Sequence, residues 1–191
     1  ILERIGVTLG GHPIPDADCV AGCERILSMT QRLTANDLVF TCVANGVSSL
    51  LTLPVPGVTL EEVQSVTQLM QIQRGAPTAD LNAVRQHLDR MKGGRISRHI
   101  QPARAIHILV AEPASYEWLT RRNFWLHTLP DGTTFASAVS KLKKWDVWDQ
   151  TPESVIRFLT EANPQHNTVS AEEFADMSPH RVFGIMPSDP H

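Results

Sequence analysis

Two cations in one segment, Arg85 and Lys92, are the first candidates for chemistry in this sequence. Apolar residues recur around them at helical spacing, and this stripe predicts a helix over 78–91 with one buried face: Leu81, Val84, Leu88 and Met91. The two cations are seven positions apart, so on a helix they point within about 20° of the same direction. A guanidinium and an ammonium side by side, followed by Gly93 and Gly94, are suited to form a phosphate clamp.

The same helix has a simpler interpretation. Asn82, Arg85, Asp89 and Lys92 follow the apolar stripe one position further on, which places them at the edge of the buried face. Arg85 and Asp89 are also four residues apart, the spacing of an ordinary ion pair on a solvated helix. Spacing alone therefore leaves open whether this polar stripe binds a ligand or only faces water.

A turn after an apolar run is the second candidate. Residues 37–44 are β-prone without interruption, as in a strand covered on both faces, and the run ends at Asn45 and Gly46. Ligands of parallel sheets bind beyond the carboxyl ends of strands, where a glycine lets backbone N–H groups approach an anion. Asn45, Gly46 and Ser48 are therefore candidate anion-binding residues. A plain strand-to-helix turn capped by serine fits equally well, because the sequence contains neither GxGxxG nor a Walker A motif.

The elements that must position these residues alternate along the chain. Further strands are expected at 103–111 and 181–186, and further helices at about 16–33, 59–73, 133–145 and 152–162. This order predicts the α/β class, with a Rossmann-like, mainly parallel sheet and helices on both faces. No internal boundary divides the chain, so residues 1–191 are expected to form a single α/β domain.

Composition and charge exclude several classes. The net charge is 17 − 20 = −3, so no overall attraction to nucleic acid or to an anionic membrane is expected. No apolar run is long enough to span a bilayer. Three cysteines cannot form a closed disulfide framework, and the eight histidines lack metal-ligand spacing, so we expect no metal site in the protein itself. These features predict a cytoplasmic protein.

Two motifs carry a resemblance to a known family. Residues 11–16 read GHPIPD, and residues 82–95 read NAVRQHLDRMKGGR. Both are similar to GHPxPD and NxVRKHLSxIKGG of the glycerate 2-kinase family, which has a MOFRL-type C-terminal domain. Residues 131–148 also resemble a helix of that family. The resemblance covers most of this chain but only the middle of the family's length, which implies part of a larger glycerate kinase-like domain.

The resemblance implies a phosphotransferase that moves the ATP γ-phosphoryl group to the 2-hydroxyl of glycerate or a similar small hydroxy acid, with ATP and Mg²⁺ as cofactors. Arg85 and Lys92 would neutralise charge as the catalytic pair. Eight residues would bind substrate or phosphate: His12, Asp16, Asn45, Gly46, Ser48, Asn82, Gly93 and Gly94. The resemblance leaves open whether the chain forms a homo-oligomer.

Departures from the family favour an alternative. The SGGGSAL loop of the family reads ANGVSSL at 44–50, where Val47 replaces a glycine, and a β-branched residue resists positive φ. The SDVxGDD segment corresponds to 110–116 and lacks its aspartates; Glu112 is one residue off. The alternative is a non-catalytic kinase-fold domain that binds a small anion or assembles with another subunit. Some family members are labelled hydroxypyruvate reductase, but nothing here predicts a nicotinamide site.

Overall fold

Three apolar segments form one parallel sheet in the computed structural model, which describes residues 5–110, 123 and 125–185. The strands β1 (Leu38–Val43), β2 (Arg104–Val110) and β3 (His180–Ile185) lie in the order β1-β2-β3. Phe40 is the register partner of Ile106, which in turn faces Arg181. The prediction of a parallel α/β fold is confirmed, including the parallel pairing of the segments 37–44 and 103–111.

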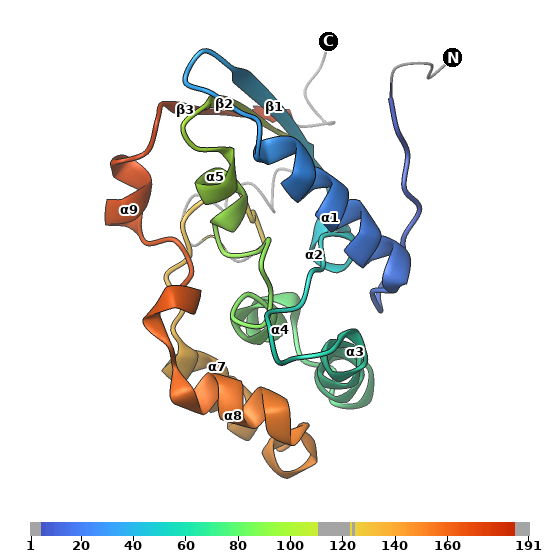
Figure 1. The fold of residues 1–191 in the computed structure, drawn as a ribbon. Coiled ribbons are helices and arrows are strands. Elements are labelled where there is room, and N and C mark those ends of the chain that lie inside the picture. The colour runs from blue at the N-terminus through green and yellow to red at the C-terminus, as the bar shows by residue number, and fades with distance from the viewer. Residues whose placement is uncertain (1–4, 111–122, 124, 186–191) are drawn as a thin grey trace.

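Helices cover one face of this sheet. Ala105, His107 and Leu109 of β2 are buried against the side on which α1 (Ala17–Thr30) and α5 (Arg95–Ile100) lie (Figure 1). On the opposite face Phe40 and Phe183 are 63% and 55% exposed. Within the described residues, β1 is therefore covered on one face only, in contrast to the expectation from its unbroken apolar run.

A second, helical half of the molecule holds the largest apolar cluster. It is enclosed by α3 (Leu60–Thr67), the π-helix η1 (Gln68–Gln73), α4 (Thr78–Arg85), α7 (Phe135–Lys144) and α8 (Glu153–Glu161). The short elements are α2 (Val47–Leu50), η2 (Trp148–Gln150), η3 (Pro164–His166) and α9 (Ala171–Ala175). Asp80 on α4 accepts hydrogen bonds from Lys144 (2.7 Å) and Trp145 (2.9 Å), which ties α4 to the end of α7. None of the described helices is both long and apolar enough to cross a membrane.

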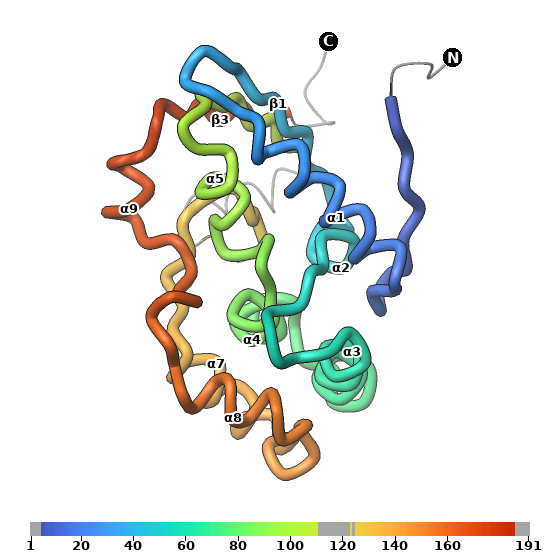
Figure 2. Tube along the Cα trace, in the orientation of Figure 1, coloured from blue at the N-terminus to red at the C-terminus, as the bar shows by residue number. Residues whose placement is uncertain are grey.

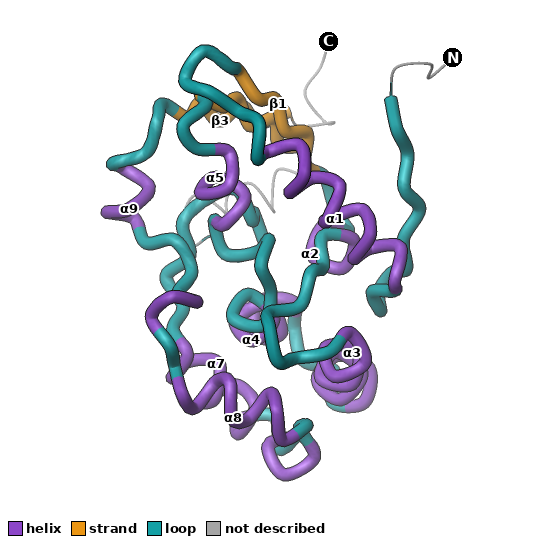
Figure 3. Tube along the Cα trace, in the orientation of Figure 1, coloured by secondary structure: helices purple, strands orange, loops and turns teal. Residues whose placement is uncertain are grey.

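The helix expected over 78–91 ends early. α4 stops at Arg85, and the chain continues to α5 as turns and loop (Figure 3). Leu88 donates its N–H to the Arg85 carbonyl, the tight pattern of a final turn. Asp89 then takes the N–H groups of Met91 and Lys92 on its side chain, so those groups are lost to the helix. Arg85 and Lys92 are therefore not on one helix face, and that expectation is wrong.

His107 lies in the middle of the sheet and links all three strands. Its Nδ1 is 2.8 Å from Thr41 Oγ1 on β1, and its Nε2 is 2.8 Å from His180 Nδ1 on β3. Burial, and to a smaller extent the His180 charge, lowers the pKa of His107 to about 4. The ring is therefore neutral at physiological pH, and both its nitrogens are used within the sheet.

This shift predicts a pH dependence of stability. Between the folded pKa of about 4 and the unfolded value near 6.5, only the unfolded chain binds the His107 proton. The free energy of unfolding should therefore fall as the pH decreases through this window, by about 1.4 kcal/mol per pH unit for this proton. Urea unfolding from pH 7 to pH 5 measures the slope. His107→Gln should make the slope shallower by one proton, and an unchanged slope would contradict the assignment.

Candidate functional site

A polar cavity of about 250 Å³ lies where the turn after β1 meets α4. In Figure 2 the short helix α2, which follows this turn, lies between the sheet and α4. The lining includes five of the residues predicted from sequence and one that was not predicted, Gln71; the five are His12, Asn45, Gly46, Ser48 and Arg85. The turn and the arginine, which the sequence could only place on separate elements, thus face the same cavity.

The turn is built around Gly46. This residue has φ = 91°, a left-handed conformation that favours glycine, and its carbonyl accepts the N–H of Ser49 to begin α2. A side chain at this position would also contact the His12 ring, which is 3.6 Å from the place of its Cβ. Val47 is the first residue of the right-handed helix α2 and packs on apolar clusters, so the expected conflict with positive φ does not arise.

Arg85 is a buried cation beside this turn. Its side chain is 3% exposed, and it donates from Nε (3.2 Å) and from one terminal nitrogen (2.9 Å) to Asn82 Oδ1. Burial lowers the pKa of Arg85 to about 10, so the guanidinium stays charged at neutral pH. Within the described part of the chain, no carboxylate pairs with it. A buried cation without a carboxylate partner, on the wall of a polar cavity, is suited to bind an anion.

A hydrogen-bonded chain fixes the wall behind the cavity. Because Arg85 occupies Asn82 Oδ1, the Asn82 amide nitrogen is left to donate to Ser48 Oγ (3.0 Å). Ser48 Oγ also lies 2.9 Å from His127 Nε2. Burial and the charges of Lys92 and Arg85 hold the pKa of His127 well below its usual value, so its ring is neutral. The three neutral residues can orient Arg85 and the turn without introducing competing charge.

Lys92 lies elsewhere, in a closed ion pair. Its Nζ is 2.6 Å from Asp89 Oδ2 and donates as well to Thr52 Oγ1 (3.0 Å) and to the Leu51 carbonyl. The side chain is fully buried, and Lys92 is not among the residues that line the cavity. All three ammonium hydrogens have partners inside the protein. This geometry favours a structural role for Lys92 over the phosphate clamp expected from the spacing.

Three other predicted site residues lie outside the cavity and make structural contacts. Asp16 caps α1 by accepting the N–H of Cys19 at 3.0 Å, and this bond lowers the pKa of its carboxyl. Gly93 and Gly94 have φ of 62° and 81°, and a Cβ on either would overlap Thr168 or Val169. They allow the chain to pass closely under that segment. None of the three lines the cavity.

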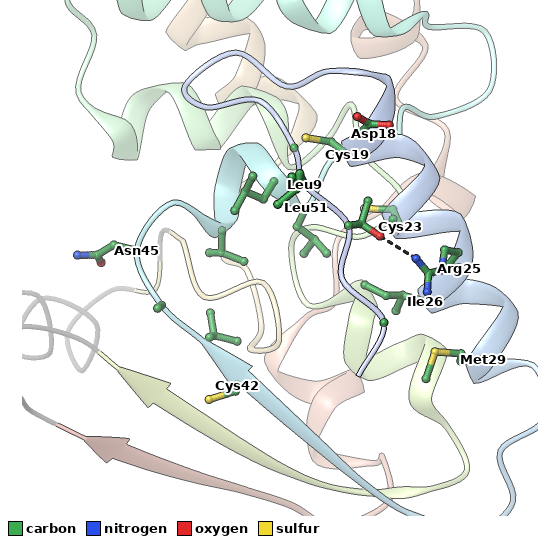
Figure 4. A pocket seen from close by; sticks show the side chains of 18 residues that line it. Leu9, Asp18, Cys19, Cys23, Arg25, Ile26, Met29, Cys42, Asn45 and Leu51 are labelled. Carbon is green, nitrogen blue, oxygen red and sulfur yellow. Dashed lines mark hydrogen bonds between the residues drawn. The ribbon is translucent and has the colours of Figure 1, made fainter. Parts of the chain in front are cut away.

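A larger cavity of about 450 Å³ lies between the segment 6–10, α1 and the end of β1 (Figure 4). Its walls are mainly apolar and include Cys19 and Cys23. Burial raises the pKa of both thiols, that of Cys23 to about 12, so neither is a thiolate nucleophile at neutral pH. The smaller, polar cavity at Arg85 is therefore the better candidate for a functional site.

The described residues fit an anion better than a metal ion. They contain no group of three or more His, Cys, Asp or Glu side chains that could hold a metal. The lining of the polar cavity includes Arg85 but no described carboxylate, the ligand that Mg²⁺ prefers. A phosphate or carboxylate group fits the cavity, whereas Mg²⁺ would find no protein ligand of its preferred kind there. The residues 111–116, including Glu112, lie outside the described residues.

Sequence reasoning missed several residues of this site. His127 and Trp125 come from a segment with no predicted element, about 80 positions after the turn, and no motif marks them. The helix predicted at about 59–73 includes Gln71, and its sequence pattern indicates no role for this residue. A tertiary contact over such a separation leaves no local pattern, so only the structure identifies these residues.

The fold and this cavity define a class: an α/β protein that holds a buried cation beyond the carboxyl end of a parallel strand. A family model described as a domain of unknown function, DUF4147, matches residues 2–112. The chain belongs to this family, the N-terminal domain of glycerate 2-kinases of the MOFRL type.

Relatives and solved structures agree with this assignment. The chain is 32% identical to D-glycerate 2-kinase of Thermotoga maritima over 158 residues, which are 82% of this chain and 36% of that protein. It is 34% identical to glycerate 2-kinase of Pyrococcus horikoshii, over 81% of this chain and 34% of that protein. A crystal structure of a P. horikoshii protein matches with a TM-score of 0.83 and 30% identity, and T. maritima glycerate kinase with 0.76 and 28%; each covers 97% of this chain and 41% of its own. The chain thus spans about a third of the length of these curated relatives.

Proposed function

We propose that the cavity at Arg85 binds a small hydroxy acid in a phosphotransferase of the glycerate 2-kinase type. The group held by Arg85 would be the carboxylate of the acid or the phosphate of its phosphorylated product. The buried guanidinium, which has no carboxylate partner in the described chain, supports this proposal most directly. Phosphoryl transfer depends mainly on positioning and on neutralising charge. Arg85 would bind the anionic group, while His12, Asn45, Gly46 and Ser48 would shape the wall and Asn82 would orient the guanidinium.

ATP would supply the phosphoryl group, as the kinase relatives imply. The cavity of about 250 Å³ is smaller than the roughly 300–1,000 Å³ typical of drug-sized ligands, so it suits one small anion and not a whole nucleotide. This chain's own contribution is to hold the acceptor acid: Arg85 fixes its anionic group, and the turn at Asn45–Ser48 limits its orientation.

The test is titration calorimetry of this chain with three probes of related size. D-glycerate and inorganic phosphate should bind and compete for one site, because both present an anion to Arg85, whereas neutral glycerol should neither bind nor compete. A further titration with Mg-ATP should give a dissociation constant in the millimolar range or weaker, a binding free energy of about −4 kcal/mol or less favourable, because the cavity accepts only one anionic group. Equal binding of glycerol and glycerate would contradict an anion site.

A second candidate is the non-catalytic anion-binding domain, which the departure of the 44–50 loop from the family motif favours. ³¹P NMR of the chain with D-glycerate and Mg-ATP separates the two. Formation of 2-phosphoglycerate supports the kinase. Anion binding at Arg85 without any phosphorylated product supports the binding domain.

A further inference from the structure

Gln71 enters the cavity from an irregular part of its helix. α3 continues directly into η1, a π-helix of six residues, Gln68–Gln73. π-helical turns are rare, and those that occur are often found at functional sites. Here the polar Gln71 is half-buried and lines the cavity, whereas its apolar neighbour Ile72 is 51% exposed. This is the reverse of the burial that hydrophobicity alone would favour.

The Gln71 side chain also has an unused acceptor. Its Oε1 is buried and has no hydrogen-bond partner among the described residues. A buried carbonyl oxygen that has left water without gaining a donor costs free energy, which a ligand that donates to it would recover. A hydroxyl can donate to this oxygen, whereas an ionised carboxylate or a fully ionised phosphate has no hydrogen to give.

We propose that Gln71 determines specificity by accepting a hydrogen bond from a hydroxyl group of the acid whose carboxylate is bound by Arg85. The inference rests on the proposed anion site and adds a specificity-determining residue, because Gln71 would make this site prefer the hydroxy-carboxylate over the same acid without hydroxyls. Arg85 supplies the charge recognition and Gln71 the hydroxyl recognition, from two elements that line one cavity. Leaving a polar group unpaired is the usual way in which such a site rejects the deoxy analogue.

The test compares D-glycerate with propionate, which keeps the carboxylate but has no hydroxyl. In the unaltered chain, calorimetry should give tighter binding of glycerate by about tenfold. Gln71→Leu should remove this preference by weakening glycerate alone and leaving propionate within about twofold. Gln73→Leu, an exposed glutamine of the same π-helix, is the matched control and should change neither affinity.

The outcomes separate this inference from the proposed function. If propionate binds as tightly as glycerate, or if Gln71→Leu keeps the preference, the role of Gln71 is wrong while the anion site stands. If neither acid binds in competition with phosphate, the anion site fails and this inference fails with it. Gln71→Asn, whose amide is one methylene shorter, covers the case in which the leucine variant does not fold, and it should lose the same preference.

Discussion

Replacing Arg85 by alanine is expected to weaken the binding of inorganic phosphate and of D-glycerate by about 10- to 100-fold. The change removes a charge-assisted hydrogen bond from a buried site, where such bonds contribute about 1.5–3 kcal/mol. Water would have to replace the guanidinium in a cavity with no other described cation on its lining. Titration calorimetry at neutral pH measures the loss directly.

The matched control for this variant is Arg74→Ala. Arg74 is a surface arginine that pairs with Asp146 at 3.3 Å, and its loss should leave anion affinity unchanged. Arg85 also donates to Asn82 and Ser49, so thermal unfolding must accompany the titration. If Arg85→Ala unfolds the chain while its folded fraction binds phosphate as before, Arg85 is structural and the site assignment fails.

The second large effect concerns the buried pair of Lys92 and Asp89. Besides the ammonium, Asp89 accepts the backbone N–H groups of Leu53, Met91 and Lys92, so one carboxylate joins the segment at Leu53 to the turn at 89–92. Lys92→Met keeps most of the side-chain volume but leaves the Asp89 charge buried without its counter-ion. The free energy of unfolding should fall by about 3–5 kcal/mol, as for other buried pairs that lose one partner.

Urea unfolding measures this loss, and the exposed neighbour gives the control, since Arg90→Ala should change stability by about 0.5 kcal/mol or less. The same variant separates a structural Lys92 from a catalytic one. The folded Lys92→Met protein should bind phosphate with unchanged affinity. A loss of affinity comparable to that of Arg85→Ala would return Lys92 to the binding site.

The sequence predicted the secondary-structure elements better than the tertiary contacts between them. The β-prone runs at 37–44 and 103–111 form parallel strands, and the helix expected at about 59–73 begins with α3, which a capping box of Thr59 and Glu62 precedes. These features depend on local preference and on period, which neighbours in sequence determine. The helix beyond Arg85 was wrong because the Asp89 side chain competes for backbone N–H groups, and an apolar stripe does not reveal such competition.

The candidate site could be predicted only in part. The turn at Asn45 and Gly46 and the arginine at position 85 carry recognisable chemistry, and the structure brings them to one cavity. His127 reaches Ser48 across 79 positions of sequence, so no spacing rule could pair them. Gln71 depends on a π-helical turn, which the periodicity of α3 does not predict.

The order of the strands has a consequence for local motion. β2 is hydrogen-bonded on both sides, while β1 and β3 each have one strand neighbour among the described residues. Local unfolding that exposes backbone amides is therefore expected to start at β1 and β3. The amides of β2 should be the last in the sheet to lose protection against hydrogen exchange. Because the Asn45–Gly46 turn follows β1, it is attached to a strand that can shift while the centre of the sheet stays intact. For the proposed anion site, this position would allow the turn to adjust without disturbing the centre of the sheet.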